Sequence, residues 1–194
     1  MTSLRQTGAG MISACVGRCH PEAISYQSMS FQRRLANLEP VETCATLESA
    51  AWERYWDGFD LATSSAAGRY TGALYLLGYV VEIILKIGFF RTIGTPPSDC
   101  VQLRDIKDHP AWARRNQNLH DIAALARVLI AERAARGKAY DPVFAGVLDQ
   151  HVQTLVAHWR EVVRYRHTPA LETEFAEVYQ STEWILCNRE MLWR

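Results

Sequence analysis

Two residues of opposite charge, Glu82 and Lys86, stand in the most apolar stretch of the chain, GRYTGALYLLGYVVEIILKIGFFR at 68–91. Four residues make about one helical turn, so the two side chains lie on one face of a helix and can form an ion pair. Charges are costly inside a bilayer, which argues against a membrane span. A helix that is apolar nearly all round is buried among other helices. The stretch 68–91 therefore predicts the central helix of an all-α bundle.

Cysteine and histidine residues offer metal chemistry at two places, but neither pattern is complete. Cys15, Cys19 and His20 form a C-x3-C-H cluster with no second ligand pair nearby. His151 and His158 fall near one helix face without a third ligand, so packing is the favoured interpretation. No metal and no cofactor are predicted. The five scattered cysteines, an odd number, favour reduced thiols in a cytoplasmic protein.

Basic residues gather between the central stretch and the turn near residue 138, where few acidic residues offset them. They are Arg104, Lys107, Arg114, Arg115, Arg127, Arg133, Arg136 and Lys138. Such a cluster is a candidate phosphate-binding face. The alternative is a solvated face, which is more common in a chain with a formal net charge of zero.

The remaining pattern predicts helices and no strands, in an up-down bundle of four to five main helices. The length of 194 residues suits one domain. Residues 1–40 lack sustained periodicity and are predicted to form a poorly ordered or loosely docked N-terminal arm. Residues 41–194 form the predicted helical domain. No targeting signal or spanning segment is recognised, and Met29 is a possible later start.

Apolar stripes and end signals place the helices along the domain. The predicted segments are 41–64, 68–91, 121–135, 141–165 and 171–193. The first two have almost no linker, so they should be antiparallel. Asn118 or His120 is predicted to cap the third helix, and Asp141-Pro142 to start the fourth. Val162 and Met191 are predicted to face inward.

Three short signatures follow one another in the predicted helices. They are Leu76-Leu77-Gly78-Tyr79-x-x-Glu82-x-x-x-Lys86, Leu119-His120-Asp121-x-x-Ala-Leu125 and Trp159-x-x-x-x-Arg164-Tyr165. As an ordered set over roughly residues 43–190, they resemble the HEPN superfamily (higher eukaryotes and prokaryotes nucleotide-binding). The resemblance implies a bundle of four to five helices that is often a homodimer. It also implies binding of nucleotide or RNA, or of a partner such as a nucleotidyltransferase.

Many HEPN members are metal-independent ribonucleases with an arginine and a histidine at the dimer seam. The resemblance places that pair at Arg160 and His167, which have six residues between them. A histidine can act as general acid or base near neutral pH, and an arginine can hold the scissile phosphate. The asparagine usual after the arginine is replaced by Glu161. A helix-capping role for the pair is the alternative.

A second match to the same pattern is Arg115-Asn116-x-x-x-His120, which includes the asparagine. Its position departs from the family, because His120 already belongs to the His-Asp signature. The alternative is that His120 caps or packs at the start of its helix.

Glu82 and Lys86 also have two interpretations. In the first they form a buried structural ion pair that reaches Arg164 or Tyr165. In the second Glu82, Lys86, His120 and Arg164 converge as a polar pocket.

Three functions remain open from the sequence. The first is a HEPN-like module, dimeric and not membrane-bound, that binds nucleotide, RNA or a partner protein. The second is an endoribonuclease of the toxin type that uses an Arg/His pair. The third is a helical scaffold without a ligand.

Overall fold

The computed structural model describes residues 42–64, 69–112 and 118–194, although the side chain of Arg164 is not among the parts described. The helices are α1 (Cys44–Thr63), α2 (Tyr70–Ile93), α3 (Leu103–Lys107), α4 (Ile122–Ala135), α5 (Pro142–His158) and α6 (Glu172–Cys187). There are also two 3₁₀ helices: η2 (Glu161–Tyr165) lies between α5 and α6, and η3 (Arg189–Leu192) follows α6. In these residues β pairing is limited to one isolated bridge between Thr43 and Cys100. The prediction of an all-α bundle is confirmed. The predicted arm at 1–40, with Cys15, Cys19 and His20, lies outside the described residues.

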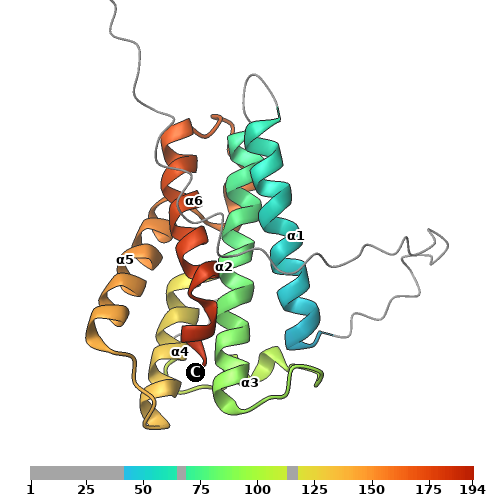
Figure 1. The fold of residues 1–194 in the computed structure, drawn as a ribbon. Coiled ribbons are helices and arrows are strands. Elements are labelled where there is room, and N and C mark those ends of the chain that lie inside the picture. Colours follow the sequence, from blue (N-terminus) through green and yellow to red (C-terminus); the bar gives the residue numbers. More distant parts are fainter. Residues whose placement is uncertain (1–41, 65–68, 113–117) are drawn as a thin grey trace, which may run out of the picture. The chain divides into compact units, whose positions relative to one another are not determined.

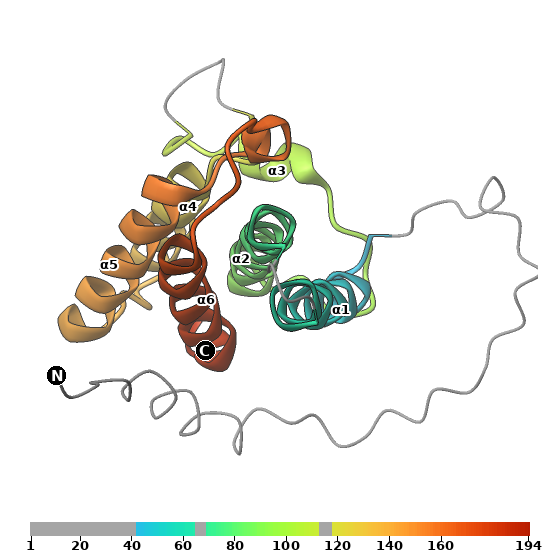
Figure 2. The same ribbon diagram turned by 90° about the horizontal axis from the view of Figure 1, so that it is seen from above.

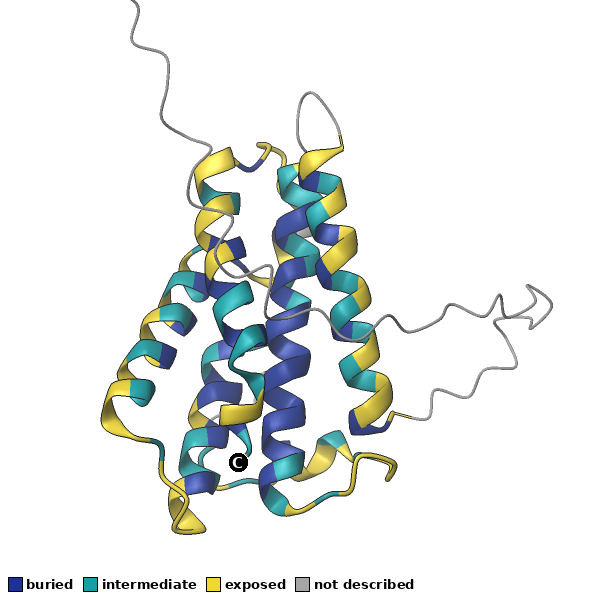
Figure 3. Cartoon of the chain, in the orientation of Figure 1, coloured by how far each residue is buried: buried dark blue, intermediate teal, exposed yellow. Residues whose placement is uncertain are grey.

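The bundle is organised around α2, the helix that carries Glu82 and Lys86. Figure 1 shows α1 running antiparallel beside α2, and Figure 2 shows α2 between α1 on one side and α4 and α6 on the other. Leu74, Leu77, Ile84 and Leu85 have no exposed surface. Much of α2 is therefore coloured as buried in Figure 3.

The length and composition of α2 also satisfy a simple test for a membrane span. Its most apolar window has a mean hydropathy of 1.9, and 83% of that window is buried within the bundle. Such burial is typical of a helix enclosed by protein.

Local signals in the sequence explain several helix ends. The Asp141 side chain accepts hydrogen bonds from the backbone N–H groups of Val143 and Phe144, and Pro142 takes the first helical position, as predicted. Gly94 ends α2 with φ at 94°, a left-handed conformation that glycine adopts without strain. The predicted cap of α4 was wrong. Asp121 is the capping residue, because its carboxylate accepts from the N–H of Ala124 at 2.8 Å.

Two predicted helices end earlier than their apolar stripes indicate. The helix that starts at Pro142 stops at His158, because Trp159 takes an extended conformation with φ at −121° and ψ at 133°. The last α-helix stops at Cys187. As a result Val162 and Met191, which were predicted to face inward, are 54% and 53% exposed.

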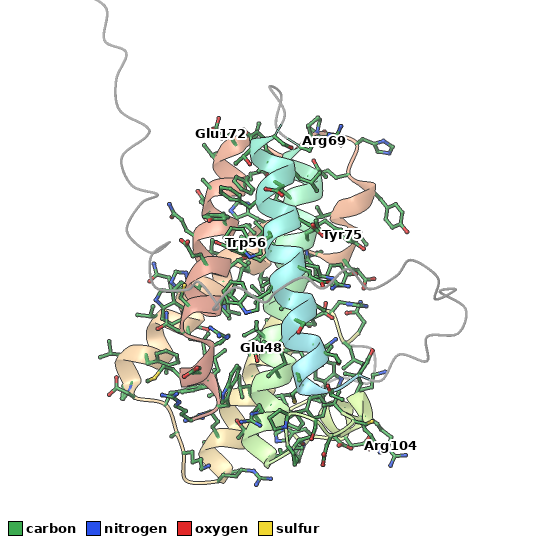
Figure 4. The ribbon with its side chains drawn as sticks, turned by 45° about the vertical axis from the view of Figure 1, so that its right-hand side comes forward. Glu48, Trp56, Arg69, Tyr75, Arg104 and Glu172 are labelled. Carbon is green, nitrogen blue, oxygen red and sulfur yellow. The ribbon has the colours of Figure 1, made fainter. Side chains whose placement is uncertain are left out.

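Aromatic and polar side chains join α1 to α6. The hydroxyl groups of Tyr55 and Tyr179 are 2.7 Å apart, and Tyr55 also donates to the Glu183 carboxylate at 3.4 Å. Burial among these rings raises the pKa of Glu183 above its usual range, although hydrogen bonds from Tyr55 and Tyr179 act in the opposite direction. Nearer the start of α1, Glu48 (labelled in Figure 4) accepts from Arg189 at 2.7 Å.

The C-terminal turn η3 is locked to α4 and to the residues before α5. The backbone carbonyl of Leu192 accepts hydrogen bonds from the Tyr140 hydroxyl at 2.8 Å and from Arg133 Nη1 at 3.2 Å. The Arg133 guanidinium lies 4.4 Å from the centre of the Tyr140 ring, and the residue is 6% exposed. Arg133 is thus a buried structural residue, and the prediction that it joins a basic surface was wrong.

Candidate functional site

The buried carboxylate of Glu82 is held by two partners. Its Oε1 accepts a hydrogen bond from Lys86 Nζ at 2.6 Å, as the helical spacing predicted. Its Oε2 lies 2.8 Å from Nδ1 of His120, which comes from the turn before α4. A carboxylate accepts from Nδ1–H, so this bond fixes the orientation of the imidazole ring and leaves Nε2 on the other side.

The far nitrogen of His120 faces a second carboxylate. His120 Nε2 lies 3.6 Å from Glu161 Oε2, and the same oxygen accepts from the side-chain amide of Asn118 at 3.1 Å. The side-chain oxygen of Asn118, Oδ1, in turn accepts from the backbone N–H of His120 at 3.0 Å. Asn118, His120 and Glu161 therefore form a small network that joins the turn before α4 to η2.

Trp159 determines where η2 lies relative to α2. Its indole N–H donates to the backbone carbonyl of Tyr75, which is labelled in Figure 4, at 3.2 Å. A Cβ placed on Gly78 would lie 2.0–2.2 Å from three atoms of the Trp159 ring, so the close contact requires glycine. The Tyr79 ring makes edge contacts with the rings of both Trp159 and His120.

These contacts surround a pocket of about 390 Å³. Its lining comes from the turn before α4, the start of α4, the end of α5 and η2. The lining residues are Asn118, His120, Asp121, Ile122, Val156, Trp159, Arg160, Glu161 and Val162. Small-molecule sites commonly have this size and combine apolar walls with a few convergent polar groups.

The structure brings together residues from the two predicted Arg/His pairs. Arg160, from the first pair, and His120, from the second, line the same pocket. His167 is exposed and follows η2, and no contact among the described side chains joins it to Arg160. Arg115 lies outside the described residues.

The predicted polar cluster around Glu82 is present in part. Glu82 and Lys86 are 3% and 7% exposed, and His120 completes the group. The side chain of Arg164 is not described. Tyr165, which was predicted to be near the pair, is 67% exposed at the end of η2.

Sequence reasoning gave no role to Asn118 or Glu161 in this network. Glu161 entered only as a departure from the asparagine usual at that position. Its position directly after Arg160, near the end of a helix, could have indicated that Glu161 belongs to the same site. Asn118 could have been recognised as a turn residue whose side chain bonds to the backbone two residues on.

Histidine residues elsewhere in the bundle have separate structural partners. His151 stacks on Trp184 and contacts Ser181 Oγ at 3.2 Å, and burial lowers its pKa. His158 pairs with Glu177 at 2.7 Å. Over the described ranges, no group of three or more His, Cys, Asp or Glu side chains could hold a metal ion.

Comparison with protein-family models, with curated proteins and with solved structures finds no match to this chain. The fold is therefore assigned as an all-α bundle from its own helices.

Proposed function

We propose that this chain is a HEPN-like helical module that binds the phosphate and base of a nucleotide or of RNA in the pocket between α4, α5 and η2. The observation that carries the proposal is that Arg160 and His120 line one pocket. A guanidinium binds phosphate oxygens through two parallel hydrogen bonds. The apolar side chains of Ile122, Val156 and Val162 offer walls for the faces of a base.

Phosphate binding by Arg160 is tested with Arg160→Gln and a fluorescent single-stranded RNA. We expect the variant to weaken binding at least about tenfold, because a charge-assisted contact contributes roughly 1.5–3 kcal/mol. Arg194→Gln is the matched control, since Arg194 is an exposed arginine that pairs with Glu190 and belongs neither to the pocket lining nor to the basic cluster. Equal affinity of wild type and Arg160→Gln would contradict the proposal.

Cleavage of RNA is a second candidate function, and one contact favours it. The bond from His120 Nδ1 to Glu82 holds the ring with Nε2 toward Glu161, in the pocket that Arg160 also lines, where a substrate 2′-hydroxyl would meet it. In this reaction Nε2 takes the 2′-hydroxyl proton and the 2′-oxygen attacks phosphorus. The 5′-oxygen then leaves with a proton from water, and the products are a 2′,3′-cyclic phosphate and a 5′-hydroxyl.

His120→Gln and His167→Gln separate the possible roles of the two histidines. If His120 is the base, its substitution should lower the cleavage rate at least about 100-fold, while His167→Gln cleaves normally. The reverse pattern would assign the role to His167, as the HEPN resemblance implies. Binding without cleavage by wild type would leave the module function alone.

The homodimer and the nucleotidyltransferase partner implied by the resemblance remain proposals. Light scattering on the purified chain tests the first, and co-purification with an adjacent nucleotidyltransferase tests the second.

A further inference from the structure

We propose that the pocket selects guanine, and that Glu161 reads the base. This inference rests on the proposed function, because it concerns the specificity of the same pocket. The pocket lining includes the carboxylate of Glu161, which a site for phosphate alone would not need.

Glu161 is held across the pocket by neighbouring groups. Asn118 Nδ2 donates to its Oε2 at 3.1 Å, and His120 Nε2 lies 3.6 Å from the same atom. These contacts come from the turn before α4, whereas Glu161 belongs to η2. The carboxylate is thus held by the turn opposite its own helix, and its side chain keeps 36% of its surface exposed. A ligand in the pocket can therefore reach it.

The hydrogen-bonding capacity of the carboxylate is not used up by these contacts. Each carboxylate oxygen can accept two hydrogen bonds. Oε2 accepts one from Asn118, and among the described contacts Oε1 accepts none. Two parallel donors on one ligand edge could therefore bind Glu161 in a bidentate manner.

Guanine is the base that offers such an edge. Its N1–H and N2–H₂ groups stand side by side on the Watson–Crick face, and single-stranded bases are commonly read there. Adenine and cytosine place an acceptor nitrogen beside their amino group, and uracil flanks its one N–H with two carbonyls. Each of these would set an acceptor against the carboxylate, so that two acceptors face each other without a proton between them.

Arg160, the neighbour of Glu161, lines the same pocket and carries the opposite charge. The two residues thus present a cation for phosphate and an acceptor for the base edge. A pocket that bound phosphate alone would be weakened by the negative charge of Glu161, so its presence is better explained by a ligand with donor groups.

The test measures affinity for the 5′-monophosphates GMP, IMP, AMP, CMP and UMP by calorimetry. We expect GMP to bind about tenfold more tightly than AMP, CMP or UMP, as for a good bidentate base contact. IMP, which lacks the N2 amino group, should lie between them. The IMP comparison uses wild type only, so it does not depend on whether any variant folds.

Glu161→Gln should abolish the preference for GMP while affinity for the other nucleotides is kept or raised. Glu172→Gln, an exposed glutamate in the first turn of α6, is the matched control. Equal affinity for all five nucleotides, or an unchanged GMP preference in Glu161→Gln, would overturn the inference. If nucleotides bind equally and Arg160→Gln weakens all of them, only the base selection fails. If none of the nucleotides binds, the base selection fails, and if single-stranded RNA does not bind either, the proposed function fails with it.

Discussion

Replacing Gly78 with alanine is expected to destabilise the bundle and to displace Trp159, which lines the pocket. The added Cβ would lie 2.0 Å from Trp159 Nε1 and 2.1 Å from Cε2, whereas ordinary contact begins near 3.4 Å. The indole ring must therefore move by more than an ångström. Trp159 is 3% exposed and donates to the Tyr75 carbonyl, so it has little room to move without losing that bond.

The size of the destabilisation follows from two effects that lower the free energy of unfolding and one that raises it. Overpacking a core costs about 1–3 kcal/mol, and losing a buried hydrogen bond costs roughly 1 kcal/mol more. Alanine gains about 1 kcal/mol over glycine in a helix interior. The net effect is a loss of about 1–3 kcal/mol in the free energy of unfolding.

Urea denaturation of wild type, Gly78→Ala and Gly146→Ala measures this effect. Gly146 is the matched control because it lies exposed in α5 and an added Cβ would meet no atom within 4 Å. It should show only the helix-propensity gain, up to about 1 kcal/mol. If Gly78→Ala were as stable as Gly146→Ala, the close contact with Trp159 would not exist as described. The affinity for RNA should also fall in Gly78→Ala, since Trp159 precedes Arg160.

Two further substitutions test the buried polar groups. Lys86→Met is expected to lower the free energy of unfolding by up to roughly 3–5 kcal/mol, because the buried Glu82 carboxylate then keeps only His120 as a partner; urea denaturation should show partial recovery when Glu82→Gln is added. Glu183→Gln addresses the raised pKa of Glu183. A carboxyl whose folded pKa is raised favours folding below its unfolded pKa and loses that contribution as pH rises through the folded value. Glu183→Gln should therefore be more stable than wild type at pH 7 and lose this advantage below about pH 4.5, near the ordinary value for glutamate. An advantage that grew at low pH would contradict the assignment.

The sequence predicted the core of the fold because its signals there are local. The apolar stretch at 68–91 and the spacing of Glu82 and Lys86 need no knowledge of distant residues. The cap at Asp141 and the stop at Gly94 are likewise set within a few positions. These features were confirmed.

The pocket could not be predicted, because it depends on where α5 ends. No glycine or proline marks the stop at His158, and the apolar stripe continues to Val163. The chain leaves the helix so that Trp159 can pack against Gly78 on α2, a contact between residues far apart in sequence. Had the helix continued to Tyr165, Arg160 and Glu161 would have been two further residues of α5. The early end instead places both beside His120.

The carbonyl of Leu192 has a practical consequence for how shortened versions of the chain behave. It is one of the atoms that satisfy the buried Arg133 guanidinium, whose Nε has no partner among the described residues. Cutting the chain after Asn188 would remove that acceptor and leave the positive charge of Arg133 beside the Tyr140 ring without it. A shortened chain that failed to bind RNA would then report a destabilised bundle rather than the pocket itself, and fusion partners are better attached without removing these last residues.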